Sequence, residues 1–377
     1  MSNTKQNEQQ GLVAVSFAAI DPYVERNMVS AKETRYAGQE RIRWGDGDRF
    51  PQYLCELYND CATLASIIDG TVNFIAGNDV IVTLPGGNLT FSPRHTNMQV
   101  VRSLAYNEEK FGGIALEVIR AKDGSIAQVD ALPIQYIRSN KDNTVFWYSE
   151  KWGKATSGDK PVRRLAFMPG LDWAAMDEKA REEHAATILY LKGDTTTTYP
   201  VPRYHAALKA AEMERNIDDY HLNSLDNCFV ASMLVNFNNG VPADPIKEEI
   251  ERDFSEKFGG HANAGRIAFS WNPNKDSQTT IIPFKTEDFG ERYNALEKAC
   301  RQKLYTSFAA VPALFGLLTE STGFSEQEFD QAFRLYNRTQ VRPVQTKIVD
   351  AFEYIYGEKV LEIVPFSLDE AREQVAR

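Results

Sequence analysis

The sequence lacks the cysteine and hydrophobic patterns of disulfide-stapled or membrane-spanning chains. Its four cysteines show no paired spacing such as CxxC, so buried, reduced thiols are expected rather than a disulfide framework. The longest low-polarity runs, residues 12–20 and 307–318, are shorter than the roughly 18 to 20 residues that cross a bilayer. Residues 1–10 are polar and are predicted to be a disordered tail rather than a signal peptide. No membrane contact is therefore expected.

Concentrated basic runs are also missing. Lysine and arginine number 42 against 52 aspartates and glutamates, which gives a formal net charge of −10. Tight binding to a phosphate backbone needs clustered basic residues that displace counterions, so a DNA clamp is not expected. A conduit that lets DNA slide gains from weak and sparse contacts, and an acidic balance is compatible with that role.

Recognisable catalytic and cofactor motifs are absent as well. The five histidines show no HExxH spacing, and neither GxSxG nor the phosphate loop GxxxxGK[ST] occurs. The glycine-rich stretch KFGGHANAGR, residues 257–266, follows a predicted helix and precedes a predicted strand. A phosphate loop has the reverse order, because amides at a helix N-terminus must face the anion, so this stretch is interpreted as a turn. No cofactor, metal or enzymatic activity is expected.

What the sequence does contain is a first half of mixed character. Apolar residues recur at helical spacing from residue 51 to residue 70, where Pro51 suits a first turn and Gly70 a stop, and one helix is predicted there. A second helix is predicted over residues 98–111. Strands are predicted around it, including a hairpin that turns at Asp123 and Gly124. Residues 152–184 follow no clear pattern.

The second half contains two long helical patterns, residues 203–227 and 286–308, on either side of a smaller insert. The insert, residues 228–285, is predicted to be a βαβ unit with strands at SMLVNF and RIAFSW. After a low-polarity stretch, a hydrophobic staple and a capping box predict the start of a helix over residues 325–357. Pro343 lies inside that helix and is expected to break or kink it.

The order of these pieces resembles the portal proteins of tailed bacteriophages, which connect head and tail at the capsid. The similar stretches are DNCFVASMLVNFNNGVP, FGGHANAGRIAFSW, TEDFGERYNALEKACRQKLYTSFAAVPALFGL and GFSEQEFDQAFRLYNRTQVRPVQTKIVDAFEYIYG. Val311, Pro312 and Gly316 are similar to a phrase that ends a family helix, and Pro343 to the proline that breaks another. FGGIALEVIRAKDGSIAQVDALPIQYIRS agrees more loosely, and residues 152–198 have no clear counterpart.

The resemblance implies an α+β portal fold with a mixed α/β wing, a two-helix stem, a small βαβ clip and a long proline-kinked C-terminal helix. On this chain the implied parts are a disordered tail (1–10), the N-terminal wing (11–202), stem helix 1 (203–227), the clip (228–285), stem helix 2 (286–308), the tunnel loop region (309–324), the kinked wing helix (325–357) and a crown or tail segment (358–377).

The resemblance also implies a ring of about twelve subunits at one capsid vertex, located in the virion and, during assembly, in the host cytoplasm. Its expected partners are further copies of this chain, the terminase large subunit, a head completion or adaptor protein, and the major capsid or scaffolding protein. Double-stranded DNA is expected to pass through non-specifically. The alternatives are a non-portal adaptor or scaffold protein of a viral or cellular assembly and, third, a metabolic or nucleotide-handling enzyme.

Three sets of residues are placed at functional positions by the resemblance. The DNA channel is expected to include basic residues of stem helix 2 and polar residues of the tunnel loop, namely Lys298, Arg301, Lys303, Glu320, Ser321 and Thr322. The partner surface of the clip is expected to include Lys247, Glu248, Glu251, Arg252, His261 and Asn263, with the helix kink at Pro343. Alternatively, the three basic residues of stem helix 2 only balance Glu297 and the helix C-terminus.

Overall fold

The structure is a computed structural model of the chain. It describes residues 32–35, 40–87, 89–152, 160–193, 196–226, 233–237, 242–247, 249, 252, 267–271, 289–316 and 326–367. The chain forms two compact units. The insert unit comprises Met1–Asn27 and Asn216–Asn294, and the body comprises Met28–Arg215 and Ala295–Arg377. The predicted disordered tail, residues 1–10, lies outside the described residues.

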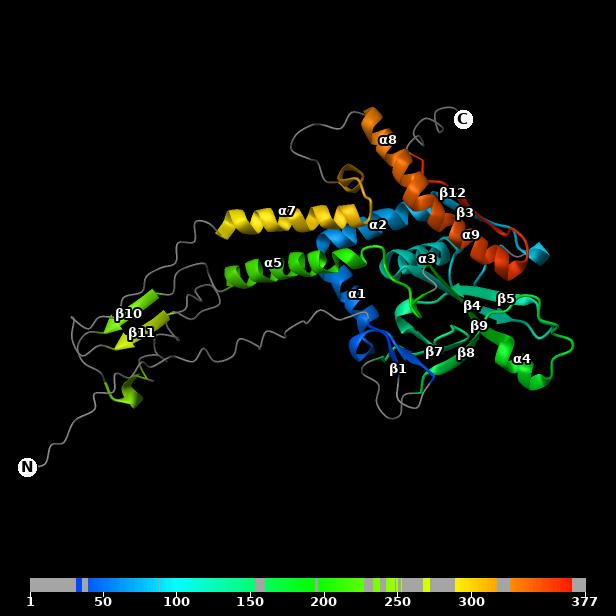
Figure 1. Ribbon diagram of the computed structural model, residues 1–377, viewed down its shortest axis with the longest axis horizontal. Helices are drawn as coiled ribbons and strands as arrows, with labels where there is room; N and C mark the ends of the chain where they lie inside the picture. Colours follow the sequence, from blue (N-terminus) through cyan, green and yellow to red (C-terminus); the bar gives the residue numbers. More distant parts are fainter. Residues whose placement is uncertain are drawn as a thin grey trace, which may run out of the picture. The chain divides into compact units, whose positions relative to one another are not determined.

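A six-stranded sheet with the order β5-β4-β9-β8-β7-β6 forms one layer of the body (Figure 1). Every neighbouring pair is antiparallel except β8 and β9, which are parallel. The predicted hairpin at Asp123 and Gly124 is confirmed, because β4 and β5 pair on either side of that turn. The strands are β4 (Gly113–Arg120), β5 (Ile126–Ala131), β6 (Ile137–Ser139), β7 (Val145–Tyr148), β8 (Val162–Ala166) and β9 (Ala186–Lys192).

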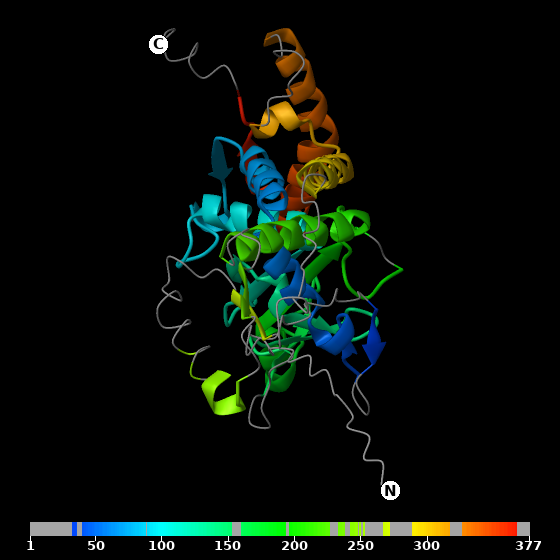
Figure 2. The same cartoon turned by 90° about the vertical axis from the view of Figure 1, so that its left-hand side faces the viewer.

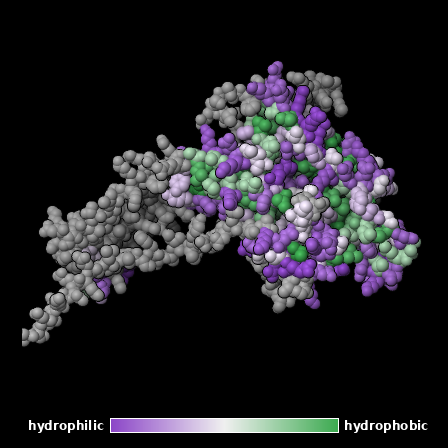
Figure 3. Space-filling model, viewed as in Figure 1, coloured by the Kyte–Doolittle hydropathy of each residue, from purple (hydrophilic) through white to green (hydrophobic). Residues whose placement is uncertain are grey.

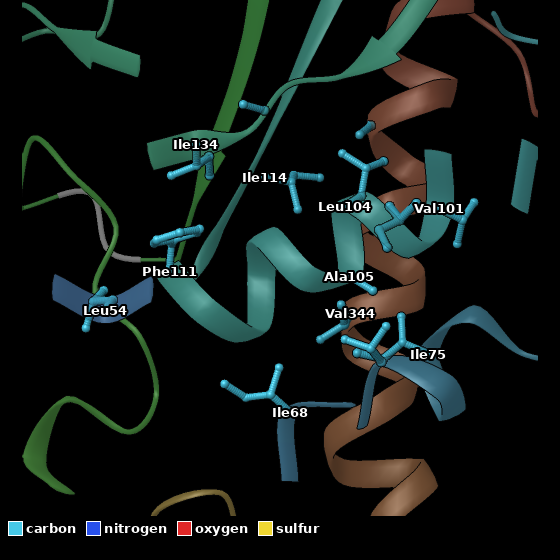
Figure 4. Packing of buried hydrophobic residues seen from close by; sticks show 14 of the residues in the cluster. Leu54, Ile68, Ile75, Val101, Leu104, Ala105, Phe111, Ile114, Ile134 and Val344 are labelled. Atoms are coloured by element: carbon cyan, nitrogen blue, oxygen red, sulfur yellow. The ribbon is translucent and has the colours of Figure 1, made fainter. Parts of the chain in front are cut away.

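Helices supply the other side of the body's apolar core (Figure 4). Leu104 and Phe111 of α3 pack with Ile114 of β4, Ile68 of α2 and Val344 of α9 in one cluster of fully or nearly fully buried side chains. These residues lie at helical or alternating spacing, so each element turns one apolar face inward. The helices of the body are α1 (Phe50–Asp60), α2 (Ala62–Ala76), α3 (Asn97–Phe111), α4 (Glu178–Ala185), α8 (Glu326–Tyr336) and α9 (Arg342–Tyr356).

The single helix predicted over residues 51–70 is wrong in two respects. Cys61 adopts an extended backbone conformation and separates α1 from α2, and α2 continues to Ala76. Gly70 lies inside α2 rather than at its end. A Cβ at Gly70 would come within 2.6 Å of the Phe315 ring, so glycine is needed here for close packing. The apolar spacing did not reveal the break, because the buried stripe runs on through Cys61.

Two further parts of the body differ from the sequence-based expectation. Residues 152–198, which have no clear counterpart in the portal family, contain β8, α4 and β9, and both strands belong to the central sheet. The segment expected as a crown or tail, residues 358–377, begins with β12 (Leu361–Val364), which pairs antiparallel with β3 (Asp79–Val82). This strand therefore belongs to the body, and residues 368–377 lie outside the described part. A short pair of strands, β1 (Thr34–Arg35) and β2 (Ile42–Arg43), completes the body.

α8 and α9, drawn in orange in Figure 2, are joined by a π-turn, Asn337–Val341. Pro343 is the second residue of α9. Because proline has no amide hydrogen, the carbonyl of Thr339 lacks its usual helical donor. The change of helix geometry thus lies one turn ahead of the proline.

Two long helices, α5 (Leu208–Asp226) and α7 (Phe289–Ser307), have residues in both units. They lie in the expected stem regions, residues 203–227 and 286–308. Within the insert unit, the ring of Tyr220 on α5 stacks on that of Tyr293 on α7, with centroids 5.0 Å apart.

The insert unit also contains a strand pair, β10 (Met233–Phe237) and β11 (Ile267–Trp271), which is parallel, as expected of a βαβ unit. Phe237 stacks on Trp271 at a centroid distance of 4.3 Å. Parallel strands need a crossover connection rather than a tight turn, which agrees with the predicted order of strand, helix and strand.

Candidate functional site

The basic residues of α7 lie on the solvent-exposed side of a helix whose other side is buried. Cys300 and Leu304 are at most 1% exposed, and Phe308 continues this stripe directly after the helix. Lys298 and Lys303 are both exposed. At 100° per residue they project roughly 140° apart around the helix axis. Neither has an ion-pair partner within the described part of the chain.

Arg301 differs from these two lysines, because it forms an ion pair with Glu297, one helical turn earlier. The exposed fractions of the two side chains are 44% and 26%, so the pair lies at the border of the buried stripe. An exposed pair at this spacing contributes only tenths of a kcal/mol to stability, but it neutralises the charge of Arg301 locally. This is the balancing role that the sequence left open as an alternative.

The start of the expected tunnel loop region, residues 309–324, is fixed to the body. Ala309 has a φ of +48°, and a short 3-10 helix, Pro312–Phe315, follows. The ring of Phe315 lies 5.6 Å from that of Tyr336 and 6.1 Å from that of Phe74, in edge-on geometry. Glu320, Ser321 and Thr322 lie outside the described residues, so the loop's expected channel positions stay a prediction.

The root of α5 holds a buried polar cluster that sequence reasoning missed. Glu212 accepts a hydrogen bond from the Tyr53 hydroxyl at 2.9 Å and forms an ion pair with Arg215. Glu214 accepts hydrogen bonds from the Thr63 hydroxyl and amide at 2.6 and 3.3 Å. The side chain of Arg215 is only 2% exposed.

Burial and these carboxylates shift the titration of their neighbours. Burial, and then the hydrogen bond and charge of Glu212, raise the pKa of Tyr53. Burial, and then the charge of Glu214, raise the pKa of the Cys61 thiol to about 12. Both groups are therefore neutral at physiological pH. The carboxylates inside the apolar stretch AALKAAEMER were the only sequence signal for this cluster.

Of the residues expected on the clip's partner surface, the structure describes two. Lys247 pairs with Asp244 at 2.8 Å, and its side chain is 13% exposed. Arg252 is exposed. Glu248, Glu251, His261 and Asn263 lie outside the described residues, so the structure does not bring this set together.

Metal-binding clusters and membrane-spanning helices are absent from the described ranges. No group of three or more histidine, cysteine or carboxylate side chains there could hold a metal ion. No helix in those ranges is long and apolar enough to cross a membrane. On the face of the body seen in Figure 3, hydrophilic residues are interspersed with small hydrophobic groups, as is ordinary for a folded surface.

The fold of this chain is similar to that of a chain in gene transfer agent particles. No family model matches the chain. An uncharacterized protein of Rickettsia felis is 22% identical over 343 residues, covering 79% of this chain and 84% of that protein. A chain of the native gene transfer agent particle aligns with 92% of this chain and 90% of its own length at 16% identity. The TM-score is 0.51 in the virion and 0.50 in the neck computed with C12 symmetry.

An HK97 family phage portal protein from Corynebacterium diphtheriae aligns with 86% of this chain and 96% of its own length, at 12% identity and a TM-score of 0.47. The likeness to the gene transfer agent chain shows a shared fold. The mixed α and β fold expected from the resemblance to portal proteins is confirmed, and the likeness to the gene transfer agent chain extends over 92% of this chain.

Proposed function

We propose that the chain is a portal protein, which forms a ring at one capsid vertex and serves as the channel for genome packaging and ejection. The observation that carries this proposal is the shared fold over 92% of the chain with a protein in the neck of gene transfer agent particles. That neck was computed with C12 symmetry, and the ring proposed for this chain likewise has twelve subunits.

In this proposal α5 and α7 form the stem and the insert around β10 and β11 forms the clip. The clip docks the terminase large subunit during packaging and a head completion or adaptor protein afterwards, while the body contacts the major capsid or scaffolding protein. The ring assembles in the host cytoplasm and remains in the virion. Deleting residues 228–285 and rejoining the stem with a short linker should abolish terminase binding. Intact terminase binding would place the partner surface elsewhere.

Contact with DNA is weak and non-specific in this proposal. Lys298 and Lys303 are exposed without an ion-pair partner in the described ranges, whereas Arg301 is paired with Glu297. Binding becomes steeply salt-dependent at roughly 6 to 10 phosphate contacts. If each of twelve subunits made one phosphate contact, the ring would already reach that number. The net charge of −10 per subunit opposes such tight binding and therefore favours sliding of DNA over clamping.

The mass of the purified protein tests this function directly. One subunit has a mass of 42.5 kDa, so a ring of twelve has a mass of about 510 kDa. Light scattering at several protein and salt concentrations should detect that assembly. A 42.5 kDa monomer under all conditions would favour the adaptor reading instead.

A packaging assay with a matched control tests the channel. Replacing Lys298, Arg301 and Lys303 by glutamine should lower the DNA packaged per capsid while rings still form. Replacing Lys122, Lys141 and Lys179, three exposed lysines of the body, by glutamine makes the same charge change away from α7 and should have no effect. Normal packaging by the first variant would show that these three residues do not take part in the channel.

A further inference from the structure

Polar side chains fasten the π-turn and the start of α9 to the helices beneath them. Thr71 of α2 and Tyr336 share a hydrogen bond of 2.7 Å between their hydroxyls. Gln345 donates to the carbonyl of Ile75 at 2.9 Å. Single π-turns inside α-helices are uncommon and often lie at functional sites. We call this set of contacts the polar seam; it also includes Glu108 with Lys347 (2.7 Å), and Arg203 with Glu109 and Gln340.

Arg203 is the central member of the seam. One guanidinium nitrogen donates to Gln340 of the π-turn and the other to Glu109 of α3, both at 2.9 Å. The chain on either side of Arg203 is fixed to the end of α3. The Tyr204 hydroxyl donates to the carbonyl of Lys110 at 2.8 Å, and the carbonyl of Val201 lies so close to Gly112 that no Cβ fits there. Arg203 therefore links the approach to α5 with the π-turn.

Glu109 is the member of the polar seam whose hydrogen bonding is least complete. Its side chain is fully buried, and its Oε2 atom has no hydrogen-bond partner among the described residues. Burial raises the pKa of Glu109 to about 7, while the charge of Arg203 opposes that rise. Other titratable groups that act on it are Glu108 of its own helix, Lys347 of α9, Tyr336 beside the π-turn and Tyr204.

We propose that the π-turn is a hinge whose opening is controlled by Glu109, because lifting the π-turn off α2 and Arg203 would hydrate the carboxylate oxygen that has no partner in the closed form. Arg203 acts as a positioning residue that holds the closed form. Since Phe315 packs on Tyr336 as well as on Phe74 of α2, opening would also remove one of the contacts that hold the 3-10 helix Pro312–Phe315 at the start of the tunnel loop region. This hinge goes beyond the channel function proposed above.

The sign of the pH dependence follows from linkage. The pKa of Glu109 is about 7 in the closed form and near its ordinary value of 4.5 once the group is hydrated. The protonated group therefore favours the closed form, and the ionised group favours opening as the pH rises through 7. With these two values the opening equilibrium constant increases about tenfold between pH 6 and pH 8.

Hydrogen exchange of the full-length protein, followed by mass spectrometry, tests the hinge. After correction for intrinsic exchange rates, peptides covering residues 333–345 should open about tenfold more at pH 8 than at pH 6, while peptides from β4 should not change. In Glu109→Gln the pH dependence should vanish. In the matched variant Glu353→Gln, at an exposed position of α9, it should persist.

A flat profile in the wild type overturns the proposal, and so does an unchanged slope in Glu109→Gln. An equal response of the β4 peptides would show global unfolding and would overturn it as well. If Glu109→Gln does not fold, Arg203→Lys provides the second test, because lysine keeps the charge but cannot donate to Glu109 and Gln340 in the same forked geometry. That variant should open more than the wild type at both pH values, and equal opening would contradict the positioning role.

Discussion

Two arginines are buried almost completely in the body, and their surroundings differ. Arg138, in β6, is 0% exposed and donates to Asp48 through Nε at 2.5 Å, to the Asp48 carbonyl at 2.9 Å, and to the carbonyls of Gln135 and Ile137 at 3.0 and 2.8 Å. Arg215, in α5, pairs with Glu212 and, through Nη1 at 3.8 Å, with the partly exposed Asp60, but its Nε and Nη1 atoms form no hydrogen bond in the described ranges.

The difference indicates which of the two regions is held in one fixed arrangement. A buried charge whose hydrogen bonds are complete fixes its surroundings, whereas each buried donor without a partner costs about 1 to 3 kcal/mol. The sheet around Arg138 belongs to the first kind, and the root of α5 belongs to the second. In the proposed portal, the sheet keeps its shape while the stem root tolerates rearrangement.

Replacing Arg138 by methionine should have the largest effect on stability. The carboxylate of Asp48 would remain buried without its partner, and removing one member of a buried pair costs about 3 to 5 kcal/mol. Urea unfolding at pH 7 measures the change. Arg49→Met, in an exposed pair with Glu56 at 3.4 Å, should change stability by less than about 1 kcal/mol. Equal losses of stability in Arg138→Met and Arg49→Met would contradict the special role of Arg138.

Glu109 comes next, as a buried carboxylate with one oxygen paired and the other not. Because its pKa is raised to about 7 in the folded chain, its favourable contribution to folding is complete below pH 4.5 and is lost as the pH rises through 7. The free energy of unfolding of the wild type, relative to Glu109→Gln, should fall by roughly 2 to 3 kcal/mol between pH 5 and pH 8. Parallel profiles for the two proteins would contradict the raised pKa.

Arg215→Met should cost less than Arg138→Met, about 1 to 2 kcal/mol, because two donors without a hydrogen bond are removed together with the charge and the second ion-pair partner, Asp60, is partly exposed. The double variant Arg215→Met with Glu212→Gln should recover most of that loss, since it also removes the carboxylate left without its partner. Chemical unfolding of both variants at pH 7 gives the comparison. If Arg215→Met lost as much free energy of unfolding as Arg138→Met, the difference inferred between the two sites would be contradicted.

The smallest effect on stability is expected at the exposed lysines of α7. Lys298→Gln together with Lys303→Gln should leave the free energy of unfolding within about 0.5 kcal/mol of the wild type. The same variant should reduce the salt dependence of DNA binding by the assembled protein, measured as the slope of affinity against salt concentration. An unchanged slope would show that these lysines do not face DNA.

Elements with local signals could be predicted from the sequence. The helix predicted over residues 98–111 is α3, Asn97–Phe111, because Thr96 and Gln99 form a capping box and Gly112 ends the helix in a left-handed conformation. The break at Cys61 and the pairing of β12 with β3 could not be predicted. The apolar stripe continues through Cys61 and hides the break, and the strand pair depends on contacts between residues far apart in the chain, which local spacing does not contain.

The candidate site was accessible to sequence reasoning only in part. Helical spacing could place Lys298 and Lys303 on α7, and the exposed side of that helix carries them. The Arg215 cluster and the seam around Arg203 were missed, because their members come from separate segments that only the tertiary fold brings together. The positions in residues 317–325 and most of the clip set stay predictions.

A cryo-electron microscopy map of the purified, full-length protein would decide whether the chain forms the proposed ring. We expect closed rings of twelve subunits around an open axial channel, with α7 beside the channel and the exposed side chains of Lys298 and Lys303 directed towards its lumen. Monomers, open filaments, or a ring in which α7 faces the outside would contradict it.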